Sequence, residues 1–232
     1  MAEKIRYTRR DLKEPDEFIS TFGRAVDWCR ENRSKVVAGT LGVVAVVALA
    51  LGTRAYLQWE ENKTNRELWP QLNRAREILQ APSAADPSTV AATEQSLQAL
   101  VGQHPDTRSA VYARYYLGAI AFARGNHDLA LSQFRAGIAT GKETGIMKFL
   151  LRQGIASSLE AKGDFAAAAV AYREAGTFAE AGMKTQSRLG EARVLALTGK
   201  KADAAALYRL ILKETPETPL RDLVEIRLAQ TE

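Results

Sequence analysis

The chain has 232 residues, 46% of them hydrophobic and 25% charged, and its formal net charge is +5. This composition provides for a hydrophobic core in one or two domains, and the spread of basic residues argues against the focused positive patch of a nucleic-acid-binding protein. A single cysteine, Cys29, excludes an intrachain disulfide and a cysteine-based zinc site.

Residues 1–35 form a basic segment that ends in a predicted amphipathic helix. Residues 4–13 are basic and polar, and we expect no fixed structure there. Pro15 opens the helix, with carboxylates in its first turn where the helix dipole favours them. Its apolar residues recur at helical spacing and would face a membrane surface or a membrane partner, two alternatives that stay open: Phe18, Ile19, Phe22, Val26 and Cys29.

The run VVAGTLGVVAVVALALG, residues 36–52, contains no charged residue. It is too long for a strand, it has no polar stripe on any face, and as a helix it is about 26 Å long. With two flanking residues it predicts a transmembrane helix over 36–54. Ala48-Leu49-Ala50 also fits a signal-peptide cleavage pattern, but the 35 residues before the run are longer than a usual signal-peptide n-region. An uncleaved anchor is therefore the preferred reading, and cleavage after Ala50 is the alternative.

The charges beside the run predict its orientation. Arg30, Arg33 and Lys35 precede it, whereas Glu60 and Glu61 follow it. The positive-inside rule then places residues 1–35 in the cytoplasm and residues 55–232 outside, which in a bacterium is the periplasm. Aromatic residues at the outer end, Tyr56 and Trp59, suit the membrane interface.

Residues 55–232 contain a repeated pattern. Three segments begin with a glycine that follows an apolar helical stretch: GNHDLALSQFRAG from Gly125, GDFAAAAVAYREA from Gly163 and GKKADAAALYRLI from Gly199. Five residues after each glycine comes an alanine, and nine residues after it an aromatic: Ala130, Ala168, Ala204, Phe134, Tyr172 and Tyr208. Each copy predicts two helices joined at a left-handed glycine. The alanine would let the helices approach, the aromatic would fill the gap to the next copy, and stacked pairs would bury their apolar faces.

The pattern resembles the tetratricopeptide repeat. Leu117-Gly118, Gly125, Ala130 and Phe134 match that motif in the first copy, and Pro216 ends the third where the family places its proline. The copies depart from the family in being 38 and 36 residues apart instead of about 34. The second and third also have Ile155-Ala156 and Glu191-Ala192 where Leu-Gly is expected.

A partial fourth copy lies upstream. Its first helix would cover about 62–80, where Pro70 is expected to kink the helix or to mark its start. Its second helix is indicated by Thr93, Leu97, Leu100 and Pro105, and residues 219–230 read as a capping helix. The resemblance thus implies an all-α fold, in which a transmembrane helix precedes a tetratricopeptide-like α-solenoid of about 3.5 helix pairs and a cap.

No catalytic, metal or cofactor constellation is present in the sequence, so no enzyme is predicted. His104 and His127 fall in turns 23 residues apart and are expected to be solvated. No phosphate-binding loop or nucleophile motif occurs. A solenoid usually binds protein partners along its concave face, which the first helices of the pairs would line. The candidate groove residues are Tyr112, Tyr115, Phe122, Gln153, Ser157 and Arg193. The alternative for the aromatic ones is packing in the core.

The whole layout, from the RYTRRDLK start and the PDEF helix through the anchor to the repeats, resembles the bacterial membrane-anchored tetratricopeptide-like family that includes the ancillary subunit of the SecYEG translocon. The resemblance implies an inner-membrane adaptor or holdase for protein export. Its partners would be translocon subunits and emerging polypeptides or periplasmic chaperones, without a cofactor, nucleic acid or small-molecule substrate. The alternative function is a scaffold for another envelope assembly, such as cell division or polysaccharide export.

Overall fold

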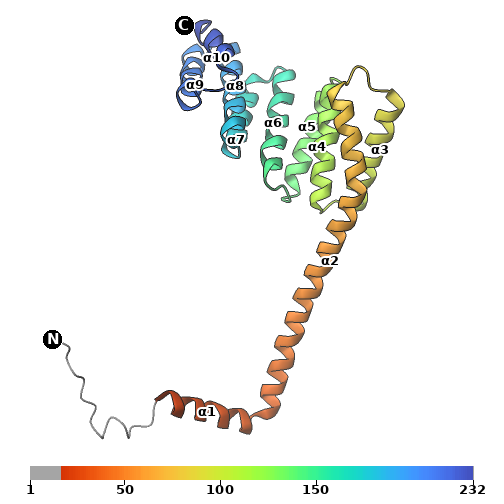
Figure 1. Cartoon of the computed structure of the whole chain (residues 1–232), viewed down its shortest axis with the longest axis vertical. Helices are drawn as coiled ribbons and strands as arrows, with labels where there is room; N and C mark the ends of the chain where they lie inside the picture. Colours follow the sequence, from red (N-terminus) through yellow and green to blue (C-terminus); the bar gives the residue numbers. More distant parts are fainter. Residues whose placement is uncertain (1–16, 232) are drawn as a thin grey trace, which may run out of the picture. The chain divides into compact units, whose positions relative to one another are not determined.

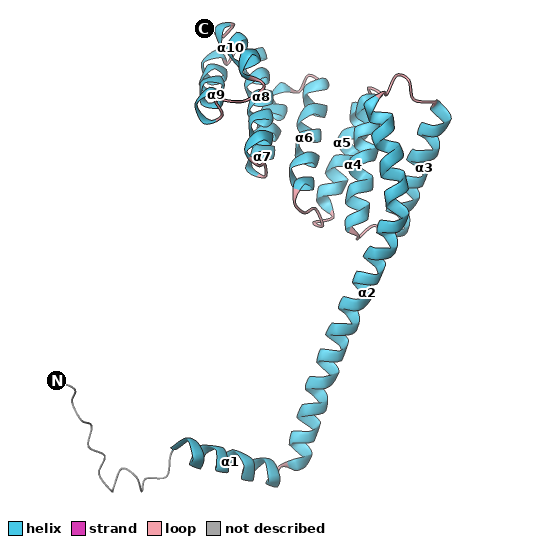
Figure 2. Ribbon diagram, in the orientation of Figure 1, coloured by secondary structure: helices cyan, strands magenta, loops and turns pink. Residues whose placement is uncertain are grey.

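A computed structural model describes residues 17–231, with side chains from residue 23 onward except that of Ala181. Every regular element in this part of the chain is an α-helix, and there are ten (Figures 1 and 2). The all-α prediction is confirmed. The chain divides into two compact units, Met1–Gln58 and Trp59–Glu232, each described by itself below.

The first unit contains α1 (Glu17–Glu31) and the beginning of α2 (Arg33–Gln80). The two helices are separated at Asn32, whose backbone N–H donates to the carbonyl of Trp28 at 2.9 Å. The carbonyl of Asn32 then accepts from Lys35 and Val36, which starts the next helix. The expected basic segment 4–13 and the expected helix start at Pro15 lie outside the described residues.

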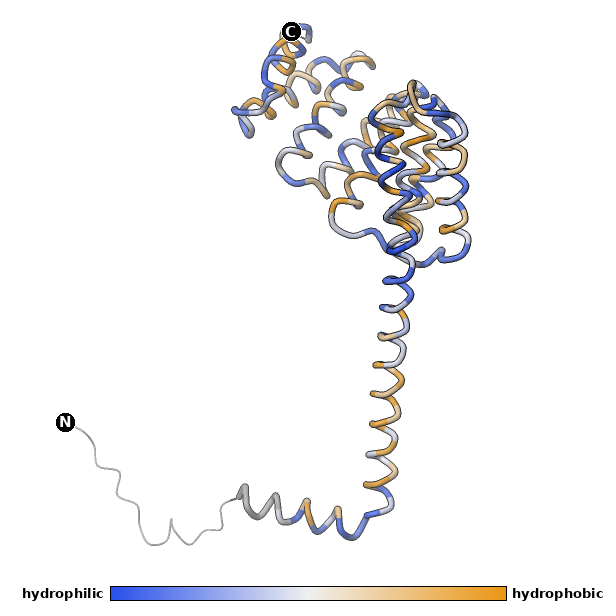
Figure 3. The backbone as a smooth tube through the Cα atoms, turned by 45° about the vertical axis from the view of Figure 1, so that its right-hand side comes forward, coloured by the Kyte–Doolittle hydropathy of each residue, from blue (hydrophilic) through white to orange (hydrophobic). Residues whose placement is uncertain are grey.

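Among the described residues, α2 is the one helix that is long and apolar enough to cross a membrane. Its most apolar stretch of 18 residues has a mean hydropathy of 2.3, and Figure 3 shows the orange of hydrophobic residues along this part of the chain. None of that stretch is buried. The hydroxyls of Thr40 and Thr53 bond to carbonyls of their own helix, at Val36 and Leu49. No hydroxyl of these two residues therefore needs a partner from outside the helix.

One helix replaces the two that were expected over 36–54 and 62–80. α2 continues through Pro70, which is exposed and neither starts nor ends a helix. The missing N–H of a proline costs one intrahelical hydrogen bond. Burial of Leu68 and Leu72, on either side of it, fixes this part of α2 against the next helices.

The second unit begins with the end of α2 and continues through eight shorter helices. They are α3 (Pro87–Gln103), α4 (Arg108–Ala123), α5 (His127–Ala139), α6 (Ile146–Ala161), α7 (Phe165–Thr177), α8 (Ala181–Leu197), α9 (Lys201–Glu214) and α10 (Arg221–Ala229). From α3 onward each helix packs against the next one in the chain, and α4 and α6 as well as α6 and α8 also touch. Figure 1 shows α4, α5 and α6 following one another from the end of α2 toward α7 to α10, and α3 on the other side of α2.

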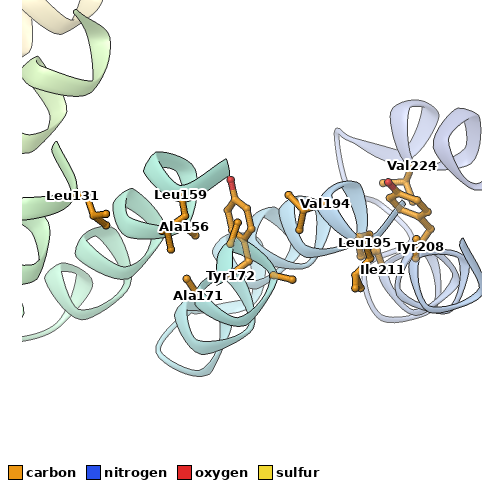
Figure 4. Packing of buried hydrophobic residues seen from close by; sticks show 14 residues of the cluster. Leu131, Ala156, Leu159, Ala171, Tyr172, Val194, Leu195, Tyr208, Ile211 and Val224 are labelled. Atoms are coloured by element: carbon orange, nitrogen blue, oxygen red, sulfur yellow. The ribbon is translucent and has the colours of Figure 1, made fainter. Parts of the chain in front are cut away.

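The core of this unit consists of three hydrophobic clusters that follow one another along the chain. The first joins α2, α3 and α4, the second α4, α5 and α6, and the third α5 to α10. Figure 4 shows part of the third cluster, from Leu131 to Val224. Neighbouring clusters share helices, since α4 belongs to the first and second clusters and α5 and α6 to the second and third.

The three repeated glycines adopt the left-handed conformation. Gly125, Gly163 and Gly199 have φ of 77, 80 and 79° and lie between α4 and α5, α6 and α7, and α8 and α9. The residue after each glycine donates its backbone N–H to a carbonyl five positions earlier, at 2.9, 3.0 and 2.9 Å. This pattern satisfies carbonyls at the helix end that otherwise lack a donor.

The alanine and the aromatic of each copy are buried. Ala130, Ala168 and Ala204 have no exposed surface. The ring of Phe134 lies against two glycines, Gly118 of its own pair and Gly154 of the next, so close that an added Cβ would be 2.6 Å from the ring at either position.

Tyr172 lies against Gly190 of the following pair in the same way, with an added Cβ 2.7 Å from its ring. Tyr208 is equally buried, in the third cluster with Val224 of α10.

Candidate functional site

The predicted groove residues lie on α4, α6 and α8, the first helices of the three pairs. Gln153 and Tyr115 occupy equivalent positions ten residues before the turn glycine, and Ser157 and Arg193 equivalent positions six residues before it. Residues four apart share one face of a helix. These side chains therefore line one face of the first helices, and all of them are half-buried.

The aromatic members of the set are engaged in packing. Tyr112 and Tyr115 contact both the first and the second cluster, and Phe122 contacts the second. The Tyr115 ring lies edge-on to Tyr116, with centroids 5.2 Å apart, and burial raises its pKa. These rings contribute to the contact between helices and present only part of their surface to a partner.

Two polar members are joined in a network around Glu160. The guanidinium of Arg193 donates to both carboxylate oxygens of Glu160 at 2.6 Å, and the Tyr172 hydroxyl donates to one of them at 2.6 Å. Ser157 lies 3.3 Å from that hydroxyl. The network connects α6, α7 and α8 across the junction of two pairs.

The network determines the ionisation of its members. Burial raises the pKa of Glu160, but the hydrogen bonds from Arg193 and Tyr172 and the charge of Arg193 outweigh burial and bring the pKa below its ordinary 4.5. Burial, together with the hydrogen bond to Glu160, raises the pKa of Tyr172 to about 12. At neutral pH the site therefore holds a carboxylate, a guanidinium and a protonated phenol.

Gln153 does not join this network. Its side-chain oxygen accepts a hydrogen bond of 2.9 Å from Ser187, which ties α6 to α8 at another point. The structure thus brings Ser157 and Arg193 together and leaves Gln153 and the aromatic residues in separate contacts.

A pocket with a volume of about 610 Å³ lies between α7, α8 and α9, and Tyr172 and Ser187 are among its lining residues. The residues that α8 contributes to it include Ser187, Glu191 and Leu195. Residues two apart on a helix point to nearly opposite sides, so Glu191 and Arg193 face different sides of α8. The sequence pattern did not reveal this pocket, because it depends on which residues differ between copies.

Both histidines differ from the expectation that they are solvated. His104 is largely buried, with its Nδ1 3.3 Å from Glu60. The Nδ1 of His127 is also buried, and its ring lies 5.2 Å from that of Phe122. Short loops place both rings against neighbouring helices, which position in a turn does not reveal.

The acidic pair after the apolar run has structural partners. Glu60 contacts His104, and Glu61 accepts a 2.8 Å hydrogen bond from the backbone N–H of Arg108, the first residue of α4. A carboxylate at a helix N-terminus satisfies a free donor and complements the helix dipole. Through these contacts, the two glutamates of α2 hold the turn between α3 and α4 against α2.

The apolar set on α1, expected to face a membrane surface or a membrane partner, is described only in part. Val26 is half-buried and Cys29 is exposed, as is the neighbouring Trp28. Phe18, Ile19 and Phe22 belong to α1, but their side chains lie outside the described residues. Among the described residues, no group of three or more potential ligands is arranged to hold a metal ion.

Comparison with known proteins identifies no relative: no family model, no curated protein and no solved structure matches the chain.

Proposed function

We propose that this protein is a membrane-anchored adaptor or holdase at the protein export machinery of a bacterium. Its helix pairs would form a tetratricopeptide-like solenoid on the periplasmic side, and its partners would be translocon subunits together with emerging polypeptides or periplasmic chaperones. The resemblance in layout and in the repeats supports this proposal.

One structural observation supports the membrane anchor in this proposal: the apolar stretch of α2 is wholly unburied, although α2 continues into the core of the second unit. The central helix of a soluble protein would bury such a stretch, because burial of apolar surface drives folding. A lipid environment would cover it instead. The arginines and lysine before the stretch support a cytoplasmic N-terminus.

The packing of the aromatic residues favours a second candidate, a scaffold for another envelope assembly such as cell division or polysaccharide export. Because Tyr112, Tyr115 and Phe122 are engaged in the clusters, little aromatic surface remains for unfolded clients. Such a scaffold would bind one folded partner through the polar part of the groove.

Photo-crosslinking in intact cells distinguishes the two candidates. A photoreactive amino acid replaces Val43, which is exposed in the apolar stretch, and in a second strain Ala119, the α4 equivalent of Ser157 and Arg193. Translocon subunits at Val43 with exported chains or chaperones at Ala119 support the export proposal. One envelope-assembly protein at both positions, without a translocon adduct, refutes it and supports the scaffold.

A further inference from the structure

The pocket between α7, α8 and α9 differs from the equivalent place one copy upstream, between α5, α6 and α7. Equivalent positions are 38 residues apart in the second helices and 36 apart in the first helices. Three large aliphatic side chains upstream are replaced by small or polar ones at the pocket: Ile138, Leu151 and Ile155 become Gly176, Ser187 and Glu191. At the upstream junction Leu151 is fully buried in a cluster, whereas at the downstream junction its equivalent Ser187 lines the pocket.

The replacement of Ile155 by Glu191 does not serve packing. The side chain of Glu191 is only 6% exposed, and a buried ion pair is seldom more stabilising than aliphatic residues in the same place. Its partner Arg173 is 67% exposed, with Nε and Nη2 at 2.8 and 2.6 Å from the same oxygen. Glu191 therefore holds the guanidinium of Arg173 at the edge of the pocket.

Two further cations line the pocket from α8. Arg188 is held by Glu214 of α9 at 2.6 and 3.3 Å, and Lys184 lies one turn earlier and is exposed. A guanidinium has five N–H donors, so Arg173 and Arg188 keep donors after each has bound its carboxylate. Asp203 of α9 is the remaining acidic group on the wall.

Aliphatic side chains form another part of the wall, beside the hydroxyls of Thr177 and Ser187. Leu195 is buried beneath the pocket, Leu207 is half-buried, and Ala206 lies exposed beside them. A volume of about 610 Å³ falls within the range of ligand pockets and accommodates a few residues of polypeptide. The wall thus combines held guanidinium groups with an aliphatic surface.

We propose that this pocket binds an acidic polypeptide segment, in which a carboxylate contacts Arg173 and Lys184 and a neighbouring aliphatic side chain packs on Leu195 and Leu207. Charge complementarity favours this ligand, because three cations line the pocket against two carboxylates, Glu191 and Asp203, and Glu191 is already covered by Arg173. The proposal goes beyond the export role and does not depend on it.

The test uses the full chain in detergent and the fluorescence anisotropy of a labelled peptide with four Glu-Leu pairs. Matched peptides with Gln-Leu and Lys-Leu pairs separate charge from hydrophobicity. We expect the Glu-Leu peptide to bind at least about tenfold more tightly than the Gln-Leu peptide, as a charge-assisted contact requires. Its affinity should fall as the salt concentration rises. Equal binding of the two, or tighter binding of the Lys-Leu peptide, would overturn the proposal.

Paired variants locate the binding. Two variants should each lower the affinity for the Glu-Leu peptide about tenfold or more: Arg173→Gln and Ala206→Phe. The phenylalanine would block the pocket from an exposed position. Arg135→Gln, the upstream equivalent of Arg173, should leave binding unchanged.

If Arg173→Gln fails to fold because Glu191 loses its partner, Lys184→Gln together with Ala206→Phe gives the same answer. Full affinity in the pocket variants, or equal loss in Arg135→Gln, refutes the site. Displacement of the peptide by a second copy of the chain at high concentration also refutes it, since the pocket would then be a self-association surface.

Discussion

The ring of Phe134 is enclosed by Gly118 and Gly154, which come from two successive helix pairs. A methyl group at either glycine would overlap the ring, with the added Cβ 2.6 Å from it. Phe134 therefore sets how closely α4, α5 and α6 approach one another.

Gly154→Ala should destabilise the protein by up to about 2 kcal/mol. Overpacking costs about 1–3 kcal/mol, and alanine in a helix interior returns about 1 kcal/mol of this. Urea unfolding followed by circular dichroism measures the change. Gly102→Ala is the control, since nothing lies within 4 Å of a Cβ added at that position, and it should be neutral or stabilising. A stable Gly154→Ala variant would mean that the ring moves without cost.

The network of Glu160, Arg193 and Tyr172 should make stability depend on pH. Because the pKa of Glu160 is lowered in the fold, its contribution is present above its ordinary 4.5 and is lost as the pH falls through the folded value. Glu160→Gln should therefore be less stable than the wild type at pH 7, and the difference should shrink as the pH falls below 4.5. Urea unfolding at a series of pH values measures this. A difference that is constant with pH would show that charge plays no part.

At this scale the sequence predicted some partners and missed others. The triplet of glycine, alanine and aromatic is visible because it recurs at fixed offsets. Gly154 and Gly190 were missed as partners of Phe134 and Tyr172, because they lie in the following helix and at a different offset. The contacts of Glu60 and Glu61 were missed for the same reason: their partners are 44 and 47 residues away.

At the scale of the helices, the three glycine turns have the same geometry. Gly125, Gly163 and Gly199 share nearly the same φ and the same hydrogen bond to a carbonyl five residues earlier. A residue with a Cβ is strained in this conformation.

Gly163→Ala should cost about 1–2 kcal/mol, the usual penalty for a side chain in the left-handed region. Gly163→Asn is the matched variant, and it should cost less because asparagine tolerates this conformation. Thermal unfolding of both variants checks the order. An alanine variant that is as stable as the asparagine variant would mean that the turn rearranges.

Element boundaries were predictable where a local signal exists and not elsewhere. Glycine turns mark the ends of α4, α6 and α8, which agree with the expected pairs. The continuity of α2 was missed, because Pro70 and the polar residues after the span suggest a break. Packing of Leu68 and Leu72 in the first cluster outweighs that local signal.

For the whole chain, the division at Trp59 makes a prediction about truncation. A fragment 59–232 keeps the buried face of α2 in the first cluster and should remain folded, soluble and helical. A fragment 81–232 loses Leu68, Leu72, Ala75 and Ile78 and uncovers α3 and α4. It should unfold at a lower temperature and aggregate, as measured by circular dichroism and size-exclusion chromatography. Equal stability of the two fragments would show that α2 contributes nothing to the core.

Contacts in the second unit join helices that are neighbours in the chain or separated by one helix. A pull on the C-terminus, with the chain held at α2, should thus break the contacts of α10 and α9 before those of α3. We expect a sawtooth of small extensions in a pulling experiment, in which the last pair detaches while the first is still intact. Such a protein unfolds stepwise from one end, and the helix pairs that remain attached keep their structure.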